Sequence, residues 1–160
     1  MTHTLRFRSG QVQLRSFRVQ AADEIRPGDL MVLDGTTARP ASALPSAATS
    51  EAAREAASEL FAGVAHTASA VGEDRPVSVD VSALSVYEVN VRSGQYEIGD
   101  LLGCDAEAGV LEAARLDGVD SPTEAIARAA EFTAGPVDRL RVTFASCVNT
   151  ASANASAQIG

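Results

Sequence analysis

The sequence contains no lysine and no tryptophan, and it has only two histidines and two cysteines. All 13 basic side chains are therefore arginine, so a phosphate-binding loop of the G-x-x-x-x-G-K-[ST] type is excluded. His3, His66, Cys104 and Cys147 lie far apart, and no C-x-x-C pair occurs, so the spacing of a zinc site is missing. We expect two small buried thiols rather than a disulfide.

Long apolar runs are also missing. No stretch approaches the roughly 18 residues that a transmembrane helix needs, and the first eight residues lack the apolar segment of a secretory signal. The net charge of −8 argues against general nucleic-acid binding. We therefore expect neither a membrane nor a nucleic acid as partner.

What is present is typical of one globular domain. The 160 residues are 46% hydrophobic and include 30 alanines but few aromatics, so the core must be built mostly from Val, Leu, Ile and Ala. The charge is uneven, because residues 1–22 hold four arginines and no acid, whereas residues 23–160 hold nine arginines and 21 acids. Residues 1–20 could be a basic arm that docks on an acidic partner, or a first strand with solvated arginines. The candidate docking residues are Arg6, Phe7, Arg8, Arg15 and Arg18.

Apolar and polar residues alternate in most of the chain, which predicts a mainly β fold. One or two strands are expected around a Ser9-Gly10 turn, with a loop over 36–46 and a tail over 149–160 that a partner would order. Further strands are expected over residues 30–33, 61–65, 77–81, 86–91, 96–104, 110–114, 125–129 and 140–144.

One segment breaks the alternation. Residues 47–60 are rich in Ala and Glu and contain no Gly or Pro, which predicts a short inserted helix. Thr49 or Ser50 can cap its start, and Glu51 suits its first turn. Because large apolar residues are almost absent, we expect a thin surface helix.

Within the predicted domain, residues 21–148, the pattern occurs twice, over 25–82 and 96–145. Each copy has a Gly-Asp-Leu turn at the entry to a strand, with Gly28 and Asp29 in the first and Gly99 and Asp100 in the second. We expect positive φ at both glycines and local hydrogen bonds from both aspartates. Aligning Gly63-Val64-Ala65 with Ala125-Ile126-Ala127 gives an offset of 62 residues. Two such copies should close into a small barrel or a two-sheet sandwich.

Candidates for catalysis are few. His66 aligns with Arg128 of the second copy, which favours a polar strand edge over a catalytic base. Asp29 and Asp100 could form a carboxylate pair, but their positions in turns already give each a structural role. The acidic loops at 73–74 and 117–120 lack the ligand spacing of a calcium loop. We therefore expect no enzyme activity, no metal and no cofactor.

The order of these motifs resembles the capsid cement, or head decoration, proteins of tailed double-stranded DNA bacteriophages. The resemblance covers roughly residues 20–145, and the helix and the tail depart from it. It is carried by Pro27-Gly28-Asp29-Leu30-Met31-Val32-Leu33-Asp34-Gly35, Phe61-Ala62-Gly63-Val64-Ala65, Val77-Ser78-Val79, Ile98-Gly99-Asp100-Leu101-Leu102-Gly103-Cys104-Asp105 and Ile126-Ala127.

This resemblance implies a structural protein on the outer surface of the virion head, assembled in the host cytoplasm and bound to the major capsid protein. It also implies self-association at local symmetry positions, for which we favour a trimer and take a dimer second. The alternative is a virion module that binds a host carbohydrate or receptor. Such a module would need exposed aromatic rings, for which Tyr87 and Tyr96 are the candidates among few.

Overall fold

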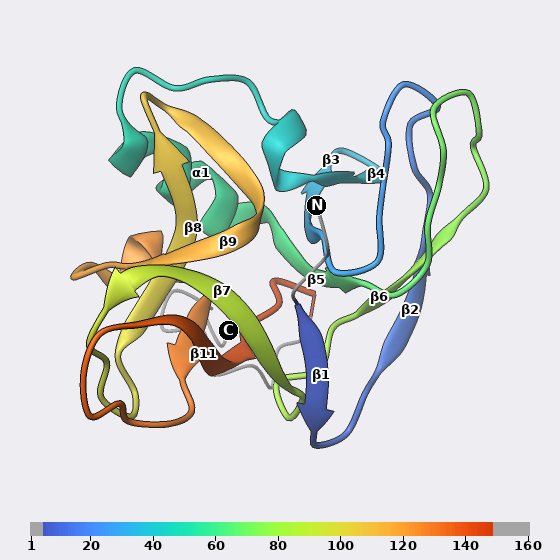
Figure 1. Ribbon diagram of the computed structural model, residues 1–160. Helices are drawn as coiled ribbons and strands as arrows, with labels where there is room; N and C mark the ends of the chain where they lie inside the picture. The colour runs from blue at the N-terminus through green and yellow to red at the C-terminus, as the bar shows by residue number, and fades with distance from the viewer. Residues whose placement is uncertain (1–4, 149–160) are drawn as a thin grey trace, which may run out of the picture.

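The computed structural model describes residues 5–148 and is mainly β, with a closed five-stranded barrel and one α-helix (Figure 1). His3 and the predicted tail lie outside the described residues. The elements are β1 (Arg6–Ser9), β2 (Leu14–Phe17), β3 (Leu30–Asp34), β4 (Thr37–Pro40), α1 (Ser50–Leu60), β5 (Phe61–Ala65), β6 (Val77–Asp80), β7 (Val86–Gly94), β8 (Leu101–Glu107), β9 (Val110–Gly118), β10 (Ala127–Ala129) and β11 (Val137–Phe144), with 3-10 turns at Ala41–Ala43 and Pro122–Glu124.

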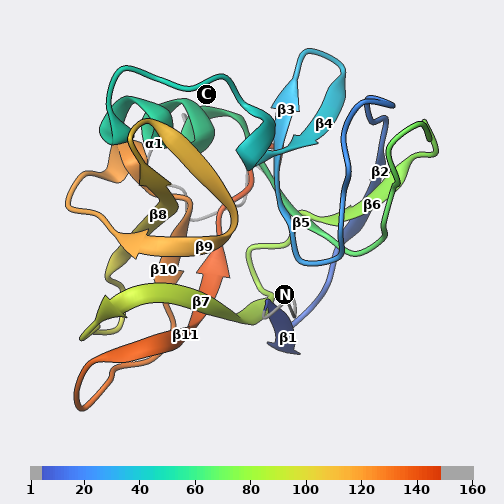
Figure 2. The ribbon, with the colours of Figure 1, turned by 45° about the horizontal axis from the view of Figure 1, so that its top comes forward.

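The chain forms two halves with the same strand order. The first half is the sheet β2-β6-β5-β3-β4, and the second is β7-β11-β10-β8-β9. The second half closes into a barrel because β7 also pairs with β9 in parallel, at Asn90↔Arg115 and Val91↔Leu116. Figures 1 and 2 show this barrel and the helix on one side of the molecule and the open sheet on the other. The prediction of a small β-barrel fold with two similar halves is confirmed, but the second half closes into the barrel alone, whereas the two copies were expected to close together.

The two Gly-Asp turns form equivalent hydrogen bonds in the two halves. Gly28 donates to Ala65 O at 2.8 Å, and Gly99 donates to Ala129 O at 2.9 Å. Their φ angles are 95° and 90°, which confirms the predicted positive values. The side chain of Asp29 accepts from Arg26 N at 2.8 Å, and that of Asp100 accepts from Glu97 N at the same distance.

The hydrogen bonds correct the alignment of the return strands. Ala65 N donates to Asp29 O and Ala129 N donates to Asp100 O, so residue 65 corresponds to residue 129. The offset is therefore 129 − 65 = 64 rather than 62. His66 consequently corresponds to Ala130 and not to Arg128, and both of these backbone amides donate to the closing strand of their half.

The predicted strands at residues 5–19 do not form a hairpin. β1 pairs with β7 of the second half, whereas β2 pairs with β6 of the first, so the segment between them crosses from one sheet to the other. Two boundaries also differ from expectation. The predicted loop at 36–46 contains β4, which pairs with β3, and the strand expected from Tyr96 begins at Leu101 because the Gly-Asp turn precedes it.

The helix is shorter than expected, and one of its faces is buried against the barrel. It begins at Ser50 because Thr49 Oγ1 accepts the N–H of Ala52 at 3.1 Å. Ala53 and Ala57 are 2% and 0% exposed and belong to the main core, so the helix covers β8 and β9 (Figure 2). The predicted short surface helix is confirmed, because most of its side chains are exposed; what the sequence did not show is that one face, through Ala53 and Ala57, packs closely on the barrel.

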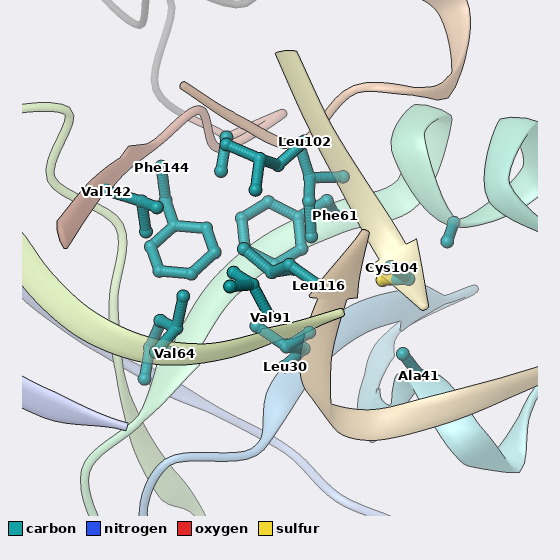
Figure 3. Close-up of a cluster of buried hydrophobic side chains, with 14 of the residues drawn as sticks. Leu30, Ala41, Phe61, Val64, Val91, Leu102, Cys104, Leu116, Val142 and Phe144 are labelled. Carbon is teal, nitrogen blue, oxygen red and sulfur yellow. The ribbon is translucent and has the colours of Figure 1, made fainter. Parts of the chain in front are cut away.

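The main core spans both halves. Figure 3 shows the rings of Phe61 and Phe144 side by side, with centroids 5.5 Å apart, beneath Leu102 and above Val64 and Leu116. A second cluster lies within the first half around Ile25, Met31, Val77 and Val79. Because Phe61 comes from β5 and Phe144 from β11, the halves share apolar contacts and pack as one body.

Candidate partner-binding surface

Four arginines gather on the outer face of three neighbouring strands. Arg6 of β1 lies opposite Glu88 of β7, and Glu88 lies opposite Arg141 of β11, so the three side chains form one row across the sheet. Arg8 and Arg139 flank this row, and all four arginines are exposed. We call Arg6, Arg8, Glu88, Arg139 and Arg141 the basic patch.

The patch is positive on a protein that is negative overall. Arg8 Nη2 contacts Glu88 Oε1 at 2.9 Å, and this hydrogen bond holds the pKa of Glu88 below its usual range. Arg139 and Arg6 lower the same pKa through their charges. The four guanidinium groups and the Glu88 carboxylate sum to +3, and Glu131, whose carboxylate accepts from Arg141 N at 2.9 Å, lowers this to +2 at the edge of the patch, against −8 for the chain. It is therefore a surface suited to an acidic partner.

The structure divides the predicted docking arm. Arg6 and Arg8 belong to the basic patch, but Arg15 and Arg18 lie on or just after β2 in the other sheet. Phe7 points to the opposite face of β1 from Arg6 and packs edge-on against Tyr87, with ring centroids 5.9 Å apart.

Sequence reasoning missed Arg139 and Arg141. They lie at least 130 residues from β1 along the chain, so a count of the N-terminal charges could not include them. The alternation of Leu140, Val142 and Phe144 with these arginines does mark them as outward-facing residues of a half-buried strand. Their place beside Glu88 depends on the pairing of β7 with β11, in which Arg141 lies opposite Glu88 and Arg139 lies opposite Asn90.

A buried carboxylate fixes the junction behind the patch. Asp80, 3% exposed, accepts four hydrogen bonds, two from backbone amides and two from hydroxyl groups. The amides are those of Gln13 and Ser82, at 2.9 and 3.0 Å, and the hydroxyls are those of Ser85 and Tyr87, both at 2.6 Å. These donors come from the crossing segment, from the linker between the halves and from β7, so one side chain ties all three together.

Tyr87 extends this network to His66. Burial, and then the hydrogen bond to Asp80, raise the pKa of Tyr87 well above its usual value, so the phenol stays protonated. Since its one proton goes to Asp80, its oxygen accepts from Nε2–H of His66, at 2.7 Å. His66 is thus a half-buried partner of Tyr87 rather than a plain strand edge.

A pocket of about 250 Å³, open to solvent and called the cavity below, lies where β1 meets the first half. Its walls are mostly apolar, with the His66 and Tyr87 rings as the polar groups. It is lined by Leu5, Phe7, Pro27, Gly28, Val64, Ala65, His66 and Tyr87. The residues come from β1, the first Gly-Asp turn, the end of β5 and β7.

The other predicted sites stay apart. Asp29 and Asp100 serve separate turns, one in each half. Over residues 5–148 no group of three or more His, Cys, Asp or Glu side chains is placed to hold a metal ion, and no helix there is long and apolar enough to cross a membrane. Both cysteines are free, as expected, but Cys147 is exposed, which corrects the prediction of two buried thiols.

No family model matches this chain, and no curated protein is significantly similar to it.

Proposed function

We propose that this protein is a structural decoration protein of a phage-type virion, bound through the basic patch to the outer surface of a shell built from the major capsid protein. The observation that carries the proposal is the cluster of four exposed arginines around one carboxylate on an otherwise acidic chain. An arginine pairs bidentately with a carboxylate, so such a cluster favours an acidic protein surface. The role requires neither catalysis nor a cofactor.

Two further observations support this function over the alternative. The motifs that carry the resemblance to head decoration proteins occupy equivalent turns in the two halves, with the same hydrogen bonds. A module that binds sugars would present aromatic faces, but the candidates Tyr87 and Tyr96 are only 3% and 6% exposed, and the exposed rings of Phe7 and Phe132 lie on different elements, β1 and the loop between β10 and β11. We therefore place carbohydrate or receptor binding second.

The test compares two pairs of arginine substitutions with equal charge change. The patch variant is Arg6→Gln with Arg141→Gln, which leaves the Arg8–Glu88 ion pair intact. The control is Arg26→Gln with Arg75→Gln, whose side chains are 51% and 74% exposed and belong to none of the three strands of the patch. Each variant is titrated onto undecorated shells assembled from the major capsid protein encoded in the same genome, and bound protein is measured after sedimentation.

We expect saturable binding by the unaltered protein and the control, and a loss of at least tenfold, about 1.4 kcal/mol, by the patch variant. Equal binding by both variants would show that the patch is not the docking surface. Absence of saturable binding by the unaltered protein would refute the proposed function itself.

A further inference from the structure

The cavity beside β1 lies on the inner side of the strand that carries Arg6 and Arg8. Leu5 and Phe7 alternate with these arginines and line the cavity, while the arginines face outward. Among the strands of residues 5–148, β1 pairs with β7 alone, so its other edge has no strand partner. A strand added there would lie about 4.8 Å away and would place every second side chain on the cavity side.

The walls of the cavity are held in place without a ligand. Tyr87 is fixed by Asp80 and His66 through hydrogen bonds of 2.6 and 2.7 Å. The Gly28 turn is fixed to the end of β5 by backbone hydrogen bonds in both directions, from Gly28 N to Ala65 O and from Ala65 N to Asp29 O. A pre-formed pocket of this kind loses little conformational entropy when it is filled.

These polar walls are not part of the repeat. By the register of the paired strands Asp80 corresponds to Thr143, and His66 corresponds to Ala130. The Gly-Asp turns, whose role is structural, are the same in both halves. Asp80 and His66, which lie where the two halves meet, have different residues at the equivalent positions. A departure from an otherwise shared pattern marks a position with a requirement of its own.

From this placement we infer that the cavity receives an apolar side chain, up to the size of a phenyl ring, from a partner strand that adds to the free edge of β1. An enclosed apolar cavity of roughly 150 Å³ holds benzene, and this pocket, which is open on one side, offers about 250 Å³, so a phenyl group can enter it from solvent. The partner strand alternates acidic residues, which face the basic patch, with apolar residues, which face the cavity. Main-chain bonds with alternate side-chain pockets are a known mode of strand recognition. As a description of the capsid contact, the inference rests on the proposed function.

The first experiment uses two peptides of identical composition, acetyl-Glu-Phe-Glu-Phe-Glu-amide and acetyl-Glu-Glu-Glu-Phe-Phe-amide. Binding to the isotope-labelled protein is followed by NMR. We expect the alternating peptide to bind at least fivefold more tightly and to shift the signals of Phe7, Gly28, Val64, His66 and Tyr87. Equal affinity, or shifts elsewhere, would overturn the inference.

The second experiment fills the cavity. Leu5→Trp places an indole at its wall, and Leu14→Trp makes the same change on β2, where the side chain is 51% exposed and does not line the cavity. We expect at least tenfold weaker binding of the alternating peptide by Leu5→Trp and no loss by Leu14→Trp. Unchanged binding by Leu5→Trp would overturn the inference, and the two peptides test it even if this variant does not fold.

The two proposals can fail separately. If Leu5→Trp still binds shells as well as Leu14→Trp does, while the patch variant does not, the cavity is not used and the proposed function stands. If the peptides discriminate as expected but no shell is bound, the cavity site stands and the capsid role is refuted.

Discussion

Asp80 is the residue on which the junction of the two halves depends. Its carboxylate accepts two backbone amides and two hydroxyl groups while almost fully buried. In Asp80→Asn the amide nitrogen cannot accept a hydrogen bond, so the hydroxyls of Ser85 and Tyr87 lose their acceptor. We expect a loss of about 2–4 kcal/mol in the free energy of unfolding, measured by urea denaturation.

The matched control for this change is Asp138→Asn, because Asp138 lies on β11 and is exposed. We expect it to alter stability by less than about 0.5 kcal/mol. Similar losses in both variants would mean that the Asp80 network contributes no more than a surface charge.

The glycines of the two Gly-Asp turns give a second prediction at this scale. Gly28 and Gly99 have φ of 95° and 90°, which a β-branched residue adopts only with strain. Gly28→Val and Gly99→Val should each cost about 1–3 kcal/mol and lower the melting temperature by several degrees. Gly135→Val is the control, since a Cβ atom added at Gly135 would have no neighbouring atom within 4 Å and the φ of this residue is not positive. Unchanged melting of both turn variants would contradict the structural role of the repeat.

The two thiols should differ sharply in reactivity. Burial raises the pKa of Cys104 to about 12, whereas Cys147 is exposed, with a pKa raised less by partial burial. Because the thiolate is the reactive form, iodoacetamide at pH 8 should modify Cys147 in the folded protein and reach Cys104 only after denaturation. Peptide mass spectrometry reads both sites. Equal modification of the two cysteines under native conditions would show that β8 opens readily.

Secondary-structure elements followed from the sequence better than their partners did. The alternating strands, the helix and the paired Gly-Asp turns were predictable because period-two patterns, alanine runs and glycine turns are local signals. That β1 joins the second half and β2 the first could not be predicted, since alternation says which face is buried and not which strand lies beside it. For the same reason, the sequence did not show that Arg139 lies in the basic patch, since that depends on the pairing of β11 with β7. β4 was missed because Thr-Ala-Arg-Pro contains one apolar residue and a proline.

The buried face of helix α1 can be tested with alanines that differ only in orientation. Ala57 is fully buried against the barrel, whereas Ala56 is exposed. Ala57→Leu should destabilise the protein by about 1–3 kcal/mol through overpacking, and Ala56→Leu should have little effect because both residues favour helix. Thermal unfolding measures both. If Ala57→Leu proves neutral or stabilising, the helix packs loosely on β8, and a small residue at this position is not needed for the helix to pack against the barrel.

At the scale of the whole molecule, the two halves share a strand order but have different tasks. The second closes on itself through β7 and β9, while the first leaves its sheet open and contributes Phe61 and Leu30 to the shared core. Closure removes strand edges from the barrel. The edge that remains beside the basic patch belongs to β1, which is an addition to the five strands of the repeat. The proposed strand addition and charge recognition would therefore both use β1, a strand that has no counterpart in the five-strand repeat.

Self-association is the last prediction, and it belongs to the assembled state. Ile98 and Phe132 are 69% and 67% exposed, on loops joined by hydrogen bonds between Tyr96 and Thr133. Two side chains bury too little area to hold copies together against a charge of −8, so we expect a monomer in solution by light scattering.

On a shell, tethering through the basic patch raises the local concentration, and closed contacts at three-fold positions favour a trimer. Ile98→Ser with Phe132→Ser should then loosen neighbour contacts without removing shell binding. A reconstruction of decorated shells that shows isolated, non-touching copies would remove the trimer.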